Sequence, residues 1–118
     1  MSTRNLFKQE LEDLEHKIIK MGSLIEEAIN NTIISLKNQD IELAEKILKN
    51  DDEIDDLEKK IERICISLIA RQHPLAKDLR KVSTALKIIT DMERIADHSS
   101  DIAEIIIKME KEKYISHY

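Results

Sequence analysis

Residues 41–71, IELAEKILKNDDEIDDLEKKIERICISLIAR, hold the pattern that decides the fold of this chain. Apolar side chains recur there at alternating steps of three and four residues, the spacing that places them on one face of an α-helix. One position on this face, Asp51, is charged and therefore unexpected in a core. A helix is predicted over about residues 41–71. Its predicted core face consists of Ala44, Ile47, Asp51, Ile54, Leu57 or Glu58, Ile61, Ile64 and Leu68.

Breaks in the pattern on both sides of this helix separate it from two others. Residues 38–40 (NQD) end the preceding segment, and Asp40 is a natural N-cap for the helix that follows. Pro74 suits the first position of a third helix. Helices are therefore also predicted over about residues 4–37 and 75–111, with residues 112–118 as a linker or a frayed end. Their predicted core faces are Phe7, Leu11, Leu14, Ile18, Met21, Ile25, Ala28, Thr32 and Leu36, and Leu75, Leu79, Val82, Leu86, Ile89, Glu93, Ala96, Ser100, Ala103 and Ile107.

The two short connections require consecutive helices to run antiparallel. The predicted fold is all-α, an up-down-up bundle of three long amphipathic helices, with residues 1–118 as a single domain. A composition of 42% hydrophobic and 36% charged residues, with one Gly and one Pro, agrees with long helices and few turns. Three helices bury only a modest core, so a second domain or a partner would help to stabilise the bundle. We expect a homo-oligomer, in the form of a homodimer.

The charge balance and the terminal segment limit the function and the compartment. Lys and Arg number 19 against 24 Asp and Glu, so the net charge of −5 is the opposite of a nucleic-acid-binding surface. No apolar run approaches the ~20 residues that span a bilayer, and no signal-peptide core follows Met1. Cys65 is alone, which is typical of a reducing compartment. We expect a cytoplasmic protein that reaches the membrane only through partners, with Cys65 as an inert core residue.

Two acidic segments carry the candidate chemistry, DDEID at residues 51–55 and ERIAD at residues 93–97. Each contains two carboxylates four residues apart, and this spacing places both on the same face of a helix. In an antiparallel hairpin folded at position 74, Asp51 and Asp97 both lie 23 residues from the turn, and Asp55 and Glu93 both lie 19. These four acids are therefore predicted to form one patch beside the core.

Such a patch has three ways to relieve the repulsion among its charges. It can bind a metal ion, take up protons, or face solvent and form ordinary surface ion pairs with Lys and Arg. Oxygen ligands suit Mg²⁺, Mn²⁺, Ca²⁺ or iron, whereas one Cys and no paired His disfavour structural zinc. Glu26, near the level of Asp51 on the first helix, and Asp101, one turn beyond Asp97, are further candidate ligands.

Catalytic interpretations find little support in the sequence. A ferritin-like di-iron site needs Glu-x-x-His pairs, and no Glu here has a His three residues later. The single Gly also argues against a Gly-rich phosphate loop. The main hypotheses are a metal-binding helical adaptor and a metal-free structural module that binds other proteins. A carboxylate-bridged metal oxidase is a third hypothesis, against which the missing Glu-x-x-His pairs count.

Four stretches that together cover nearly the whole chain form a recognisable set. They are Phe7-x-x-Glu10-Leu11-x-x-Leu14, Asp51-x-x-Ile54-Asp55-x-Leu57-Glu58, Leu68-Ile69-Ala70-Arg71-Gln72-x-Pro74-x-Ala76-x-Asp78-Leu79-Arg80 and Lys87-Ile88-Ile89-x-Asp91-x-Glu93-Arg94-Ile95-x-Asp97. With them the chain resembles the PhoU family of phosphate-signalling regulators. Members of that family look like two tandem three-helix repeats. This chain is similar to one repeat, either the N-terminal half of a longer protein or a single-repeat member.

The resemblance implies a function and a metal site. The family's Glu/Asp-x-x-x-Asp motifs carry multinuclear metal clusters, and here they fall on Asp51/Asp55 and Glu93/Asp97. Iron, Mn or Mg is the implied metal. The implied role is that of a cytoplasmic negative regulator of phosphate uptake at the inner face of the membrane. It would link a phosphate ABC transporter to a sensor histidine kinase without performing catalysis.

Four polar residues surround the second connection and have two interpretations. They can stabilise the turn through caps and polar contacts, or they can form an end of the rod that docks a partner. The four are Arg71, Gln72, Asp78 and Arg80.

Overall fold

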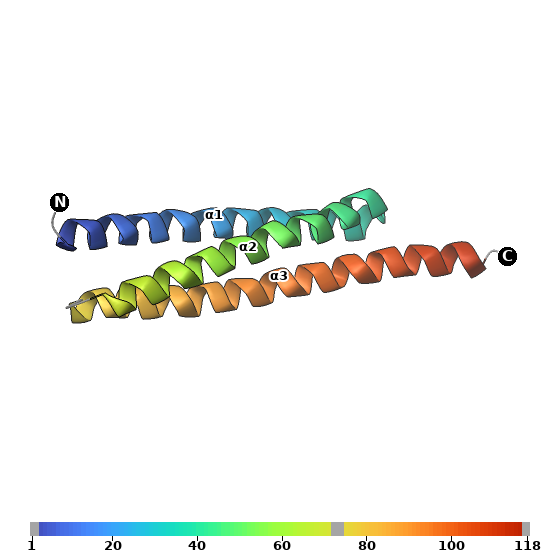
Figure 1. The fold of residues 1–118 in the computed structure, drawn as a ribbon. Helices are drawn as coiled ribbons and strands as arrows, with labels where there is room; N and C mark the ends of the chain where they lie inside the picture. The colour runs from blue at the N-terminus through green and yellow to red at the C-terminus, as the bar shows by residue number, and fades with distance from the viewer. Residues whose placement is uncertain (1–2, 72–74, 117–118) are drawn as a thin grey trace.

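The computed structural model describes residues 3–71 and 75–116 and contains, within them, three helices: α1 (Thr3–Asn38), α2 (Ile41–Ala70) and α3 (Ala76–Ser116). The helices form a rod with principal extents of 69 × 17 × 17 Å. Figure 1 shows that α1 begins at the end where α2 and α3 are connected, and that α3 runs past the α1–α2 turn at the other end. The predicted all-α, up-down-up three-helix bundle is confirmed.

The α1–α2 turn is closed by contacts of its own residues. Gln39 has a φ of 51°, the left-handed conformation in which many helices end. The Asp40 N–H donates to the Ser35 carbonyl at 3.0 Å, and the Ser35 hydroxyl donates to the Asp40 carbonyl at 2.8 Å. The Asp40 carboxylate accepts a hydrogen bond from the Leu43 N–H at 3.1 Å. The predicted N-cap is confirmed, and the turn sends α2 back along α1.

The start of α3 lies one residue later than predicted. Arg71 is extended and follows α2, and its N–H donates to the Leu68 carbonyl at 3.4 Å. At the other side of the connection, the Leu75 carbonyl accepts from the Asp78 N–H at 2.9 Å, as the residue before a helix does. The predicted role of Pro74 in starting this helix lies outside the described residues.

The end of α3 corrects the prediction of a linker or frayed end after residue 111. The helix continues to Ser116. Helical hydrogen bonds do not require an apolar face, and residues 112–116 (EKYIS) contain good helix formers and neither Gly nor Pro. The loss of apolar periodicity therefore did not mark the end of the helix.

The buried face of α3 agrees with the prediction along one line and departs from it along the next. Val82, Ile89, Ala96 and Ala103 are buried as predicted. From each buried residue of this line, the residues three and four positions further along the helix both lie on the same face. Packing against the other helices determines which of these two is buried. The second buried line is Asp78, Ala85, Ser99 and Ile106, whereas Leu75 and Leu79 are exposed and Leu86, Glu93, Ser100 and Ile107 are half-buried.

Smaller shifts of the same kind occur in the other helices. Ser35 in α1 is buried while the predicted Leu36 is 55% exposed. In α2, Cys65 is fully buried, whereas its predicted neighbour Ile64 is half-buried. Burial raises the pKa of the Cys65 thiol. This agrees with its interpretation as an unreactive core residue.

The apolar core is interrupted near its middle. A longer cluster, towards the α2–α3 connection, ends at Ile54 and Ala96. A shorter one, towards the α1–α2 turn, begins at Ile47 and Ala103. Asp51 lies on the core side of α2 between these two clusters. The charge that stood out in the sequence therefore marks a real gap in the hydrophobic core.

Candidate functional site

Five carboxylates from two helices extend from this interruption towards the α2–α3 connection and are called here the carboxylate cluster. Asp51, Asp55 and Glu58 lie on α2 at intervals of four and three residues, so they share one face. Glu93 and Asp97 lie on α3, four residues apart. Asp97 is exposed and the other four are half-buried. The cluster thus forms the edge between core and solvent where α2 packs on α3.

The acids of the cluster act on one another across the two helices. Asp97 is among the charges that raise the pKa of Asp51. Glu93, and to a smaller extent Asp97, raise the pKa of Asp55. These neighbours match the predicted register, in which Asp51 faces Asp97 and Asp55 faces Glu93. The structure therefore brings together the four acids that the distances from the turn had paired.

Burial and like charge together raise the pKa values in the cluster. The pKa of Asp51 rises to about 6, mainly through desolvation and then through Asp55 and Asp97. Desolvation also raises the pKa of Asp55. The pKa of Glu58 rises to about 8 through burial and through its close contact with Glu93. The Glu58–Glu93 pair therefore retains a proton to higher pH than two separate acids would, which reduces the charge that the cluster carries.

Three buried oxygen atoms have no hydrogen-bond partner within the described residues: Asp51 Oδ1 and Ser100 Oγ at the interruption, and Glu58 Oε2 two helical turns further along α2. A buried polar atom without a partner costs roughly 1–3 kcal/mol. Ser100 lies near enough to Asp51 to oppose part of the rise in its pKa. The cluster can therefore take a further partner, and a proton or a cation would satisfy its chemistry.

The donor set fits a hard cation, because carboxylate and hydroxyl oxygens are the ligands that Mg²⁺, Mn²⁺, Ca²⁺ and iron accept. As the side chains stand, no three His, Cys, Asp or Glu residues within 3–71 and 75–116 converge in a way that could hold a metal ion. Glu26 and Asp101 are exposed, and neither is among the main influences on the pKa values of the cluster. The structure does not bring these two into the cluster.

Glu58 is the cluster member that the sequence analysis did not select as a ligand. It follows Asp51 by seven residues, two helical turns, and so returns to the same face. The choice of Leu57 or Glu58 for the core face was left open, and Leu57 is the buried one. The signal that could have found Glu58 is its spacing of seven and three residues from Asp51 and Asp55.

The α2–α3 end of the rod carries acids of a different kind, each paired with a guanidinium from another part of the chain. Arg4 on α1 binds Asp78 at 2.5 Å, and Asp78 is 1% exposed. This hydrogen bond is the main reason that the pKa of Asp78 is lowered. Arg71 forms an ion pair with Glu10 on α1. Two of the four candidate partner-binding residues are therefore engaged within the chain.

The other two candidates at this end differ in what the structure says of them. Arg80 is exposed on α3. Gln72 lies outside the described residues. The contacts of Arg71 and Asp78 agree with the turn-stabilising interpretation, and Arg80 stays available to a partner.

Comparison with known sequences connects this arrangement to a family. The sequence model of the PhoU domain matches residues 18–106. This chain belongs to the PhoU family. Its helical fold and the acidic stretches that carried the resemblance lie largely within the matched region.

Relatives extend this similarity over almost the whole chain. The phosphate-specific transport system accessory protein PhoU homolog of Clostridium acetobutylicum is 45% identical over 113 residues, which cover 95% of this chain and 52% of the relative. That of Aquifex aeolicus is 44% identical, over 96% of this chain and 51% of the relative. The homolog of Pseudomonas aeruginosa is 35% identical, over 87% and 43%. The chain spans about half the length of these relatives.

Within the described residues, no helix is both long enough and apolar enough to cross a membrane.

Proposed function

We propose that this chain is an accessory regulator of phosphate transport that acts by binding other proteins and performs no catalysis. The observation that carries the proposal is the similarity, over at least 87% of this chain, to relatives named as accessory proteins of phosphate-specific transport. The proposed partners are a phosphate ABC transporter and a sensor histidine kinase, met at the cytoplasmic face of the membrane. The proposed effect is negative regulation of phosphate uptake, exerted by a homodimer.

We also propose that the carboxylate cluster binds a cation, with iron, Mn²⁺ and Mg²⁺ as the metals to test. The raised pKa values and the two unpaired carboxylate oxygens support this. Asp51, Asp55, Glu58, Glu93 and Asp97 would hold the ion, whose positive charge would offset their mutual repulsion. Because ligands must lose their protons, affinity should rise with pH through the range of the pKa values of Asp51 and Glu58.

Metal content tests the cation site. The untagged chain is loaded with iron, Mn²⁺ or Mg²⁺, exchanged into metal-free buffer and measured by mass spectrometry, beside the Asp55→Asn/Glu93→Gln variant. The matched control is Glu53→Gln/Asp56→Asn, which removes the same charge from exposed positions outside the cluster. We expect stoichiometric metal in the wild type and the control and its loss in the cluster variant. No metal in any of the three would favour the metal-free interaction module.

A cellular assay tests the regulatory role. The chain is expressed in a bacterium that lacks its own accessory protein, and a phosphate-starvation reporter is followed in phosphate-rich medium. A full-length relative serves as the positive control, because this chain matches about half of such proteins. Repression of the reporter by the chain supports the proposal. If the full-length relative represses the reporter and this chain does not, the proposal that this chain by itself regulates phosphate transport is wrong.

A further inference from the structure

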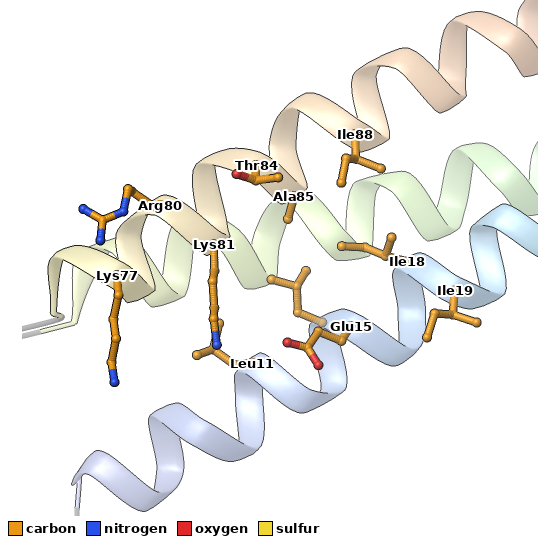
Figure 2. Close-up of a pocket in the computed structure, with 11 residues that line it drawn as sticks. Leu11, Glu15, Ile18, Ile19, Lys77, Arg80, Lys81, Thr84, Ala85 and Ile88 are labelled. Carbon is orange, nitrogen blue, oxygen red and sulfur yellow. The ribbon is translucent and has the colours of Figure 1, made fainter.

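A groove of about 580 Å³ runs between α1 and α3 near the α2–α3 end, and none of the residues that line it belongs to the carboxylate cluster (Figure 2). Its walls are mainly apolar. From α1 come Leu11, Ile18 and Ile19, and from α3 come Ala85 and Ile88. Ile19 is 67% exposed and Ile88 is 38% exposed. Apolar surface of this kind, concave and partly exposed, is typical of a binding groove.

Basic side chains line one end of the groove. Lys77, Arg80 and Lys81 are exposed on the first turns of α3. Figure 2 shows Lys77 and Lys81 extending from α3 towards the side of α1. Within residues 3–71 and 75–116, the side chains of Arg80 and Lys81 form no hydrogen bond or ion pair. Glu15 is the one acid among the lining residues, so the groove is positive in a chain of net charge −5.

The apolar wall of α3 continues beyond the groove with a helical repeat. Ile88, Ile95 and Ile102 follow at intervals of seven residues and are 38%, 43% and 37% exposed. A repeat of seven keeps side chains along one flank of a helix, and it is the spacing with which another helix packs alongside. α1 and α3 run in the same direction, so a helix seated between them would complete a fourth corner of a bundle.

We infer that this groove binds an amphipathic helix of a partner protein whose apolar face is flanked by Asp or Glu. The apolar walls would take residues at intervals of three and four, and the three cations would meet the acids. A flat membrane surface would not fill a concave groove. The inference rests on the proposed function in one respect: the partner that binds this groove is taken to be a protein that the chain regulates.

Designed peptides test the charge preference directly. The probe is an 18-residue, fluorescein-labelled helix with Leu on one face and Glu on its flank, and its counterpart carries Lys in place of every Glu. We expect the acidic peptide to bind the full chain at least tenfold more tightly, measured by fluorescence anisotropy. In the Lys77→Glu/Lys81→Glu variant the preference should reverse. The control Lys60→Glu/Arg63→Glu changes the net charge equally on α2, outside this groove, and should keep the wild-type preference.

Other outcomes would overturn the inference. The groove does not select peptides by charge if both peptides bind equally tightly. The same conclusion follows if the control variant changes the preference as much as the groove variant does. Sedimentation that shows a dimer, converted to a monomer by Ile88→Asn, would assign the groove to a second copy. Binding to anionic vesicles with no peptide binding would assign the surface to lipid. If the chain represses the reporter but shows no preference for the acidic peptide, the groove inference is wrong and the proposed function stands. If the chain prefers the acidic peptide but does not repress the reporter, the proposed function is wrong and the groove inference stands.

Discussion

The acids at the α2–α3 end and those of the carboxylate cluster lie in opposite electrical surroundings. Asp78 is buried against the guanidinium of Arg4, and its pKa is lowered. Glu58 is half-buried against Glu93, and its pKa rises to about 8. The difference lies in the partner rather than in the acid, because a fixed cation stabilises the ionised form and a second carboxylate opposes it.

At one of these places the acids are neutralised by cations of the chain, and at the other they are not. At the α2–α3 end, two ion pairs join α1 to the residues on either side of the connection. Asp78 and Glu10 are each paired there with an arginine of the same chain. In the cluster, Asp51 is surrounded by other acids and the Ser100 hydroxyl, and Lys59 on the same helix offsets only part of the rise in the pKa of Asp55. The cluster therefore depends on protons or on an added cation, whereas the end does not. The predictions that follow use this dependence.

The largest expected effect is a loss of stability of the metal-free chain as the pH rises. For Asp51 and Glu58 the folded pKa lies above the ordinary one, so the native state holds more protons than the unfolded state between about pH 4 and 8. Stability is full below that window and falls as pH rises through it. We expect the thermal midpoint to drop by roughly 5–10 °C from pH 6 to pH 8.5, an effect of about 1–2 kcal/mol in a domain of this size. Circular dichroism in the presence of a chelator measures it.

The opposite slope would contradict this account of the cluster. Asp78, whose pKa is lowered, contributes stability that is lost only when the pH falls below its ordinary range, so it does not affect this window. A midpoint that is constant or rises between pH 6 and pH 8.5 would mean that the cluster acids are not strained when ionised. Saturating cation should reduce the drop if the cluster holds it.

A smaller effect should come from neutralising one acid in each region. Glu58→Gln removes an acid that faces another acid, so at pH 8.5 it should raise the midpoint by roughly 5 °C and flatten the pH dependence. Asp78→Asn removes an acid that faces Arg4 at 2.5 Å, so it should lower the midpoint by a few degrees. Each variant removes one negative charge, and thermal melts at pH 6 and pH 8.5 compare them.

The same sign for both substitutions would break the comparison. If both variants were stabilised, net charge rather than the local partner would govern stability. If both were destabilised, the cluster would be satisfied as it stands.

The sequence predicted the helices and the register of the cluster because both follow from intervals along the chain. Steps of three and four define a helical face, and equal distances from a turn define which residues meet. It did not predict the second buried line of α3, since Ala85 and Leu86 are both apolar and only packing selected Ala85. It also could not predict that Arg4 meets Asp78, because these residues lie 74 positions apart and their contact depends on the angle between helices.

The smallest expected effect separates packing from charge at the level of the cluster. Gly22, in the middle of α1, faces Met92 on α3, the neighbour of Glu93, and an added Cβ would lie 3.5 Å from the Met92 methyl carbon. That is ordinary van der Waals contact, so the space does not require a glycine. Gly22→Ala should stabilise the chain by about 0.5–1 kcal/mol through helix propensity alone. Because it leaves every carboxylate in place, the gain in thermal midpoint should be equal at pH 6 and pH 8.5, in contrast to Glu58→Gln. A gain at only one pH would mean that the spacing of α1 and α3 is coupled to the ionisation of the cluster, and a loss at both would mean that Met92 cannot yield to the added methyl group.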